Sequence, residues 1–482
     1  YLLANANVSW SVVGGLGAGT CGVGLLAGGL PAVVRRLHRG VATPVGRRGV
    51  LVANAVVWPV IVMAILTHRG SFLKRTTYRS ICMSTTECLV RNVGASLTLQ
   101  QEVARRTEAT PDSTYAGYWG LDWDAPPSLY LVMIESYGSI LSAAESPVPH
   151  GRFMGRVADS LQADGWDMAT AQSEAPVFGG LSWLSAATLF LGTPVEHQPM
   201  FEVLRPTFTR YPHLVRLLRH HGYSTATLQP PVRTRPGLSV GNPYGFDRTF
   251  YLHDLDYRGP EVGWGIVPDH YSLSVAHKQF VETAEAPFFL FFEAVTSHGP
   301  WNVPPPTLQK KSTTLRRSAR RASASPVSMV PAGRADRSSW TERSQTERLF
   351  RHIQYEWRVL TNYLQTEAPP NSLVIVVGDH QPYFADTESR ATPLHMLSRD
   401  QSLVRRFDQY GFVPGLRPSP GADTLHHAGL YSLLVRVLTA HDRAGKSDSP
   451  TACPPFRPHG VERAALLPDL PRSAGAALEG TP

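Results

Sequence analysis

The sequence predicts an α/β fold, with helices flanking a mostly parallel central sheet and transmembrane helices preceding it. Three observations favour this fold. From residue 128 onward, short apolar runs alternate with segments of helical spacing, which is typical of a parallel sheet. Three of these runs end in polar side chains at once. Near the start of the chain, two long apolar stretches carry no charge, which is typical of membrane-spanning helices.

The composition indicates a membrane partner. The chain has 482 residues, a formal charge of +8 and 43% hydrophobic residues, enough for more than one domain. It begins with Tyr1, so we expect the natural N-terminus to be missing or processed. Four cysteines are too few for a disulfide framework. Two of the three arginine-rich segments flank the apolar stretches, where arginine typically meets lipid headgroups, so we expect no nucleic-acid partner.

Residues 1–67 are expected to form a membrane anchor with two helices. The uncharged runs at residues 8–34 and 50–67 are each about long enough for a hydrocarbon core of roughly 30 Å. Two buried helices of a soluble domain are one alternative. A signal-sequence remnant is another for the first run, although no basic region precedes that run. Five arginines lie in the loop between the runs, so the positive-inside rule places that loop in the cytoplasm and the rest of the chain outside. Basic residues at positions 69–79 weaken this orientation.

The remaining chain divides into three expected regions. Residues 68–127 form a juxtamembrane connector with helical spacing at 90–106. Residues 128–442 form the catalytic domain. A Ser- and Arg-rich segment at about 304–345 lacks apolar periodicity, which predicts a disordered insertion. Residues 443–482, rich in Pro, Gly and Ser, are predicted to form a disordered tail.

Three predicted strands deliver polar groups at their carboxyl ends. SLYLVMI at 128–134 leads to Glu135, PFFLFFEA at 287–294 leads to His298, and LVIVV at 373–377 leads to Asp379 and His380. Open α/β sheets keep their ligand crevice at this edge. Two carboxylates and an imidazole are suitable metal ligands, so these residues predict one shared site. Taken singly, each could be an ordinary surface turn.

The segment FGGLSWLSAATLFLG at 178–192 offers a nucleophile. Ser182 stands where a helix is expected to begin, and Gly192 is expected to end it. Free N–H groups at a helix start stabilise an alkoxide and a bound phosphoryl group. The alternative is that Ser182 only caps the helix.

Four motifs carry a family resemblance. IESYG, FGGLSW, TSHGPW and GDHQP follow one another in the order and spacing of sulfatase-like membrane enzymes of the alkaline phosphatase superfamily. The chain resembles most closely the branch of lipoteichoic acid synthases and phosphoethanolamine transferases, over roughly residues 128–440. The resemblance implies one divalent ion (Mn, Zn or Mg) bound by Glu135, Ser182, Asp379 and His380. Ser182 stands where the family has a nucleophilic threonine.

The resemblance also implies substrate contacts and limits the reaction. His298 matches a catalytic histidine that contacts the substrate phosphate. Trp301, Trp264 and His395 are further expected substrate-binding residues, with Trp264 in the cleft wall. His395, in PLHM, is expected near the metal, and a core histidine is an equal alternative. The residues after Ser182 lack the proline and arginine of the formylglycine signal, which disfavours sulfate esters. The stretch LQPPVRTR has no histidine for a glycerol-phosphate contact, which leaves the headgroup open.

The implied function is transfer of phosphoglycerol or phosphoethanolamine from a phospholipid donor to an envelope glycan or lipid. A phosphoseryl intermediate would carry the group, and the catalytic domain would face outward from a bacterial cell membrane. One alternative is a sulfatase-like phosphodiesterase or sulfuric ester hydrolase. Another is a non-catalytic membrane scaffold without a metal.

Overall fold

The computed structural model describes residues 85–233, 241–264, 267–285, 287–305, 342–418, 425–444 and 453–468. The chain divides into two units, Tyr1–Thr98 and Leu99–Pro482. The helical spacing at 90–106 corresponds to α5 (Thr85–Glu108). The expected membrane spans and the loop between them lie outside the described residues. Within the described ranges, every helix is too short or too polar to cross a bilayer.

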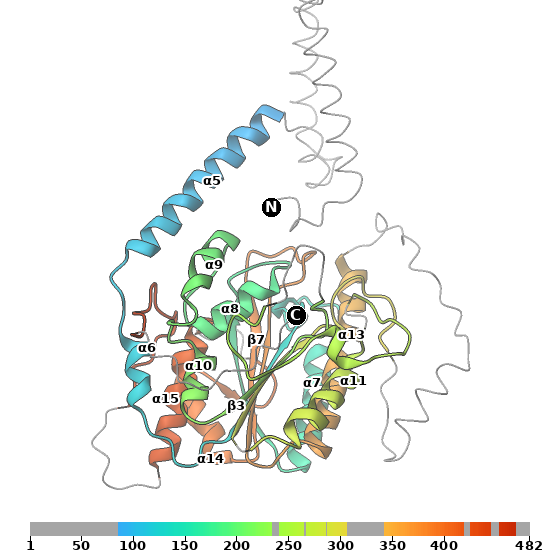
Figure 1. Ribbon diagram of the computed structural model, residues 1–482. Coiled ribbons are helices and arrows are strands. Elements are labelled where there is room, and N and C mark those ends of the chain that lie inside the picture. Colours follow the sequence, from blue (N-terminus) through green and yellow to red (C-terminus); the bar gives the residue numbers. More distant parts are fainter. Residues whose placement is uncertain are drawn as a thin grey trace, which may run out of the picture. The chain divides into compact units, whose positions relative to one another are not determined.

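The second unit is built on one mixed sheet of nine strands in the order β4-β3-β5-β1-β6-β7-β2-β8, with β9 beside β2 (Figure 1). Strands β4, β3, β5, β1 and β6 are parallel, whereas β7, β2 and β8 each run antiparallel to the preceding strand in this order. The mostly parallel prediction is therefore confirmed for the centre of the sheet. The strand bounds are β1 (Ser128–Ile134), β2 (Asp167–Glu174), β3 (Ser224–Leu228), β4 (Arg248–Phe250), β5 (Phe288–Ala294), β6 (Ser372–Gly378), β7 (Ala391–Ser398), β8 (Val413–Pro414) and β9 (Leu425–His426).

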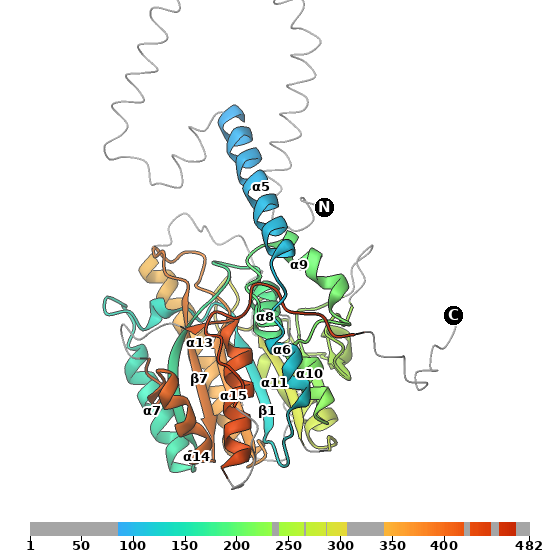
Figure 2. The same cartoon turned by 90° about the vertical axis from the view of Figure 1, so that its left-hand side faces the viewer.

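Helices cover both faces of the sheet. Helices α8, α10 and α15 pack on one face, and α7, α11 and α13 pack on the other (Figures 1 and 2). The helix bounds are α6 (Thr114–Gly117), α7 (His150–Ala163), α8 (Ser182–Leu191), α9 (Gln198–Leu204), α10 (Leu214–His220), α11 (Asp269–Ala276), α13 (Glu342–Thr366), α14 (Gln401–Val404) and α15 (Gly429–Arg443).

This double cover explains why the central strands are continuous apolar runs. Every residue of β1 and β6 is buried. Successive β1 side chains alternate between two cores, with Leu129 and Leu131 under α8 and Tyr130 and Val132 under α13. A strand covered by helices on both faces has no position at which a polar side chain reaches water.

Two boundaries differ from the expected ones. Helix α13 begins at Glu342, so the last four residues of the expected insertion belong to a helix. In the expected disordered tail, residues 453–468 are ordered and pack against the rest of the second unit. Val461 N donates to Gly192 O at 2.9 Å, and Asp112 and Ala464 form a parallel bridge. Backbone hydrogen bonds and burial of Val461 hold this segment, and its composition gives no sign of either.

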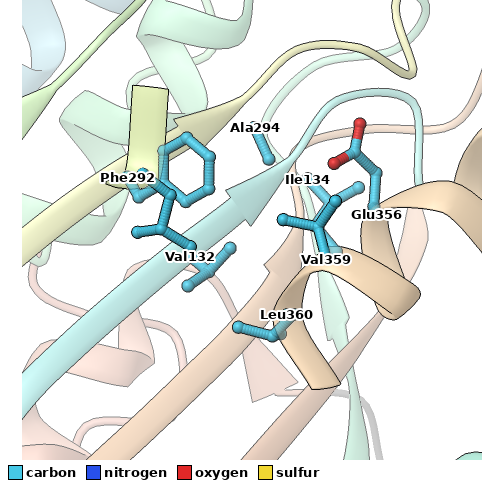
Figure 3. A pocket seen from close by; sticks show the side chains of 8 residues that line it. Val132, Ile134, Phe292, Ala294, Glu356, Val359 and Leu360 are labelled. Carbon is cyan, nitrogen blue, oxygen red and sulfur yellow. The ribbon is translucent and has the colours of Figure 1, made fainter. Parts of the chain in front are cut away.

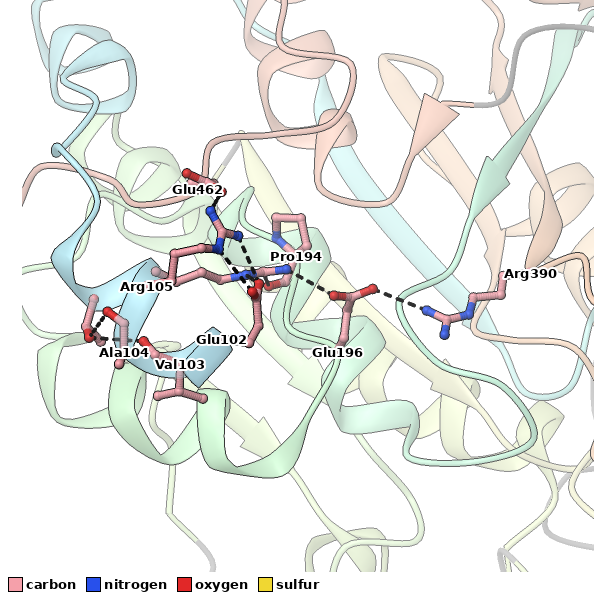
Figure 4. Close-up of polar contacts among 10 residues, drawn as sticks. Glu102, Val103, Ala104, Arg105, Pro194, Glu196, Arg390 and Glu462 are labelled. Atoms are coloured by element: carbon pink, nitrogen blue, oxygen red, sulfur yellow. Dashed lines mark hydrogen bonds and ion pairs between the residues drawn. The ribbon is translucent and has the colours of Figure 1, made fainter. Parts of the chain in front are cut away.

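The last turns of α5 belong to the second unit. Their charged side chains form ion pairs with other residues of that unit (Figure 4). Arg106 pairs with Glu102 at 2.6 Å and with Glu196 at 3.0 Å, and Arg390 pairs with Glu196 at 3.2 Å. Arg105 pairs with Glu462. Arg106 is largely buried, and its partner Glu196 also pairs with Arg390. The network therefore contributes more to stability than isolated surface ion pairs do.

Candidate active site

The sheet register brings the two expected carboxylates together. Ile134 pairs with Gly378 across β1 and β6, so the next residues, Glu135 and Asp379, emerge side by side at the carboxyl edge. The close approach of the strands requires glycine at 378, because a Cβ there would lie 1.9 Å from the carbonyl oxygen of Tyr137. The shared edge predicted from the sequence is thus present.

Glu135, Asp379 and His380 form a compact and buried group of possible metal ligands. His380 Nε2 lies 3.2 Å from Asp379 Oδ2 and 3.5 Å from Glu135 Oε1. One ligand atom from each residue lies within 4.8 Å of the others. All three residues are at most 5% exposed, so bulk water screens their charges little.

The chemistry of this group fits a divalent cation. Asp379 Oδ1 accepts the backbone N–H groups of Ser136 and His380, each at 2.7 Å, whereas its buried Oδ2 has no hydrogen-bond partner among the described residues. His380 Nδ1 lies 2.8 Å from the carbonyl oxygen of Gln381 and donates to it, which directs the Nε2 lone pair at the carboxylates. Burial and the negative charge of Glu135 raise the pKa of Asp379 well above its usual range. A bound cation would satisfy the orphan oxygen and balance both carboxylates.

Ser182 faces this group from the start of α8. Its Oγ donates to Glu135 Oε2 at 2.9 Å and lies 3.4 Å from His380 Nε2. Leu181 precedes it in a left-handed conformation with φ of 67°, a strain that bulky residues keep mainly at functional sites. The helix ends at Leu191 with Gly192 in the left-handed conformation, as predicted. Ser182 is therefore a first-turn residue pointed at the carboxylates, and Leu181 holds the capping position.

His298 lies at the mouth of the site and is partly exposed. Its Nδ1 lies 2.6 Å from Gly299 O and donates to it, so the proton-transfer role would fall to Nε2. The imidazole is close enough to influence the pKa values of Glu135 and His380. Trp264, which is 41% exposed, stacks on its ring.

The other two residues expected to contact substrate lie in the interior. Trp301 is fully buried, and its indole donates to Ser297 O at 2.6 Å. His395 is also fully buried, with Nε2 3.2 Å from the Tyr137 hydroxyl and Nδ1 2.7 Å from Thr170 Oγ1. Burial lowers the pKa of His395 to about 3. Both ring nitrogens are engaged within the protein, which favours the core-histidine alternative for His395.

A buried acid pair supports the loop that carries His298. Asp269 Oδ2 accepts the N–H groups of Val295 and Thr296, at 2.9 and 2.7 Å. Asp269 Oδ1 and Glu356 Oε1 have no donor among the described residues, and the two carboxyl groups interact with each other. Burial raises the pKa of Asp269 to about 6 and that of Glu356 well above its usual value. One proton shared between the two carboxyl groups accounts for this arrangement.

Glu356 also borders an apolar cavity of about 10 Å³ between β1, β5, α11 and α13 (Figure 3). Its lining is Val132, Ile134, Leu273, Phe292, Ala294, Glu356, Val359 and Leu360. A space of this size is near the minimum for one water molecule and offers that water few polar partners. The cavity therefore leaves Glu356 in apolar surroundings, consistent with its raised pKa.

Sequence reasoning missed two polar residues near the metal ligands, Gln229 after β3 and Glu293 within β5. Gln229 Nε2 donates to Glu293 Oε2 at 2.8 Å. Neither belongs to a motif, but one signal was available. Glu293 is an acidic residue inside the otherwise apolar run FFLFFEA, where a charge needs a reason.

No family model and no curated protein matches this sequence. Several solved structures are similar in structure. The lipoteichoic acid synthase LtaP from Listeria monocytogenes is 14% identical, with 67% of this chain and 77% of that chain covered and a TM-score of 0.40. The lipooligosaccharide phosphoethanolamine transferase EptA from Neisseria meningitidis is 11% identical, with 81% and 69% covered and a TM-score of 0.45. A protein in the alkaline phosphatase superfamily from Vibrio parahaemolyticus is 14% identical, with 70% and 75% covered and a TM-score of 0.41.

These names are those of the superfamily and branches that the four motifs resemble. At such identities and scores the likeness carries no argument about activity, which rests on the geometry of the site.

Proposed function

We propose that the chain is a metal-dependent phospho-alcohol transferase with Ser182 as its nucleophile. One observation carries the proposal. The Ser182 hydroxyl, at the start of α8, lies within hydrogen-bond distance of Glu135 and faces the buried group of Glu135, Asp379 and His380. A serine held against suitable metal ligands, near a partly exposed histidine, has the parts that covalent phosphoryl transfer requires.

Each residue has a distinct role in the first half-reaction. A divalent cation held by Glu135, Asp379 and His380 would lower the pKa of the serine hydroxyl and neutralise a phosphoryl oxygen. Ser182 Oγ passes its proton to Glu135 Oε2, to which it is already hydrogen-bonded, and attacks phosphorus. The bond from phosphorus to the leaving alcohol breaks, and the electron pair goes to the alcohol oxygen. His298, protonated at Nε2, supplies the proton for that oxygen.

The second half-reaction reverses these roles. An acceptor hydroxyl loses its proton to His298 and attacks the phosphoserine diester. The bond from phosphorus to Ser182 Oγ breaks, its electron pair goes to Oγ, and Glu135 returns the proton to Oγ, which regenerates the serine. An envelope glycan or lipid acceptor makes the enzyme a transferase, whereas water makes it a phosphodiesterase. The proposed anchor at residues 1–67 favours transfer, because it would keep the site near phospholipid donors.

The test combines metal analysis with mass spectrometry of the full chain. Purified protein is incubated with phosphatidylglycerol or phosphatidylethanolamine, and peptides containing Ser182 are searched for a phosphoglycerol or phosphoethanolamine adduct. We expect about one divalent ion per chain, an adduct on Ser182 and no turnover in Ser182→Ala. Ser160→Ala, on the exposed side of α7, is the matched control. Turnover that persists in Ser182→Ala would refute the proposal, and headgroup release that needs only water would identify a hydrolase.

A further inference from the structure

The sheet places a second polar pair, Gln229 and Glu293, beside the metal ligands. Leu228 pairs with Phe292 across β3 and β5, so Gln229 lies directly opposite Glu293. In the same way, Glu135 lies opposite Asp379 on the next two strands. The strand order β3-β5-β1-β6 therefore puts the Gln229–Glu293 pair next to the pair formed by the metal-ligand carboxylates.

Both pairs project from the same face of the sheet. On β1, Leu131 and Met133 belong to the core under α8, and alternation places Glu135 on that face. On β5, Phe289 and Phe291 belong to the same core, so Glu293 shares the face. Ser182 approaches from this side, since α8 packs here.

The offset between the two pairs suits a small alcohol. Met133 is the register partner of Glu293, so Glu293 lies one strand over and two residues earlier than Glu135. These steps correspond to about 5 Å across the sheet and about 7 Å along it. A two- or three-carbon alcohol esterified to a phosphate near Ser182 has the length to reach the Gln229–Glu293 pair.

Glu293 has unused capacity to accept hydrogen bonds. Gln229 donates to Oε2, and no cationic side chain among the described residues forms an ion pair with Glu293. Burial, with the charges of Glu135 and Asp269, raises the pKa of Glu293 to about 7, against the lowering effect of Gln229. Yet Gln229 and Glu293 are partly exposed, whereas Glu135 and Asp379 are buried. A half-paired carboxylate at the end of an apolar strand is costly unless a ligand completes its hydrogen bonds.

We propose that the Gln229–Glu293 pair is a subsite that binds a hydrogen-bond donor, an ammonium or a hydroxyl, on the alcohol portion of the phosphodiester substrate. Glu293 accepts the hydrogen bond from the ligand, and Gln229 holds the carboxylate in position. This inference rests on the proposed function and adds to it the source of headgroup selectivity. The subsite contributes no metal ligand and no nucleophile.

Three chromogenic phosphodiesters test the subsite on the full chain loaded with metal. They are the p-nitrophenyl esters of phosphoethanolamine, phosphoglycerol and propyl phosphate, which offer an ammonium, two hydroxyls and no donor. In the wild type, we expect kcat/KM to be higher for the two donor-bearing esters than for the propyl ester. In Glu293→Gln, this advantage should fall on the order of tenfold or more, which is the size of a lost hydrogen bond to a charged group. The propyl ester should change by less than about twofold, as a group that makes no such hydrogen bond loses nothing.

Controls separate the subsite from a general effect on the enzyme. Glu388→Gln, at an exposed position, should change none of the three rates. Glu293→Asp keeps the charge but shortens its reach, so its losses should lie between those of the wild type and Glu293→Gln. A larger loss for the ethanolamine ester identifies the ammonium as the ligand, and a larger loss for the glycerol ester identifies the hydroxyls.

Two results would overturn the subsite. One is an equal loss for all three esters in Glu293→Gln, which would show a structural or catalytic role. The other is no loss for any ester. In both cases the wild type would still turn over the propyl ester through Ser182, so the proposed function would stand. If no ester reacts in the wild type, the proposed function itself fails.

Discussion

The indole ring of Trp264 stacks on the imidazole ring of His298, with ring centroids 4.3 Å apart and planes 16° from parallel. The stack fixes the ring plane of a histidine whose Nδ1 is already held by Gly299 O. Two constraints on one ring leave Nε2 in a defined direction. For a proton donor this orientation matters as much as the pKa.

Removing the stack should slow the reaction without removing the metal. Trp264→Ala is expected to lower kcat/KM roughly three- to tenfold, the range that an aromatic pair contributes. Trp264→Phe keeps an aromatic face and should retain most of the rate. The measurement is steady-state turnover with metal content determined in parallel. Equal rates in the alanine variant and the wild type would show that the stack does not orient His298.

The metal ligands predict a coupling between metal and stability. A cation that binds only the folded protein stabilises it by about 2.7 kcal/mol when its concentration is 100 times Kd. Chelation should therefore lower the melting temperature of the wild type. Asp379→Asn should hold no stoichiometric metal and should show no response to chelator. Asp386→Asn, at an exposed position, is the control. If the metal binds elsewhere in the protein, chelator would lower the melting temperature of Asp379→Asn as well as that of Asp386→Asn.

The acid pair predicts a dependence of stability on pH. The folded pKa of Asp269 is raised to about 6 from an unfolded value of 3.8, so the folded state binds more protons between these values. The contribution of Asp269 to the free energy of unfolding should be fully present below about pH 4 and should fall by about 3 kcal/mol as pH rises through 6, since each pKa unit corresponds to about 1.4 kcal/mol. The raised pKa of Glu356 extends the fall to higher pH.

Substitution of Glu356 tests this directly. In Glu356→Gln the amide can donate to Asp269 Oδ1, so Asp269 can ionise and the slope of stability against pH should flatten. Urea unfolding at several pH values between 4 and 8 measures the slope. Glu347→Gln, also on α13 but partly exposed, should leave it unchanged. A slope that is identical in Glu356→Gln would show that the pair does not share a proton.

Close packing between β6 and the turn after β1 predicts a severe effect at Gly378. Gly378→Ala would place a methyl group against Tyr137 O, and we expect a loss of about 3 kcal/mol or more in the free energy of unfolding. Gly151→Ala, in α7 with open space around it, should be neutral or stabilising by up to about 1 kcal/mol. Chemical denaturation compares the two. A stable Gly378→Ala protein with intact metal binding would mean that the turn relaxes easily.

Local patterns predicted those parts of the molecule that depend on local patterns. The run at Ser128–Ile134 is a strand from end to end, because continuous burial leaves a continuous apolar signal. The end of α8 before Gly192 follows from its left-handed backbone. The adjacency of Glu135 and Asp379 follows from the shared carboxyl edge of parallel strands.

Other features depend on long-range pairing, which one sequence does not display. The antiparallel direction of β7 leaves no mark on its composition. The Gln229–Glu293 pair joins two strands by register alone and lies outside every motif. His395 shows the same limit, since only its contacts with Tyr137 and Thr170 place it in the core.

The segment at 453–468 has a practical consequence for anyone shortening this chain. Gly192 O, at the far end of α8 from the nucleophile, receives bonds from the Tyr115 hydroxyl and from Val461 N. The proline-rich composition of the tail suggests truncation after Arg443. Such a truncation removes Val461, one of these two anchors, and exposes the end of the helix that positions Ser182. Such a shortened protein could lose its reaction while every residue that performs the chemistry is still in place.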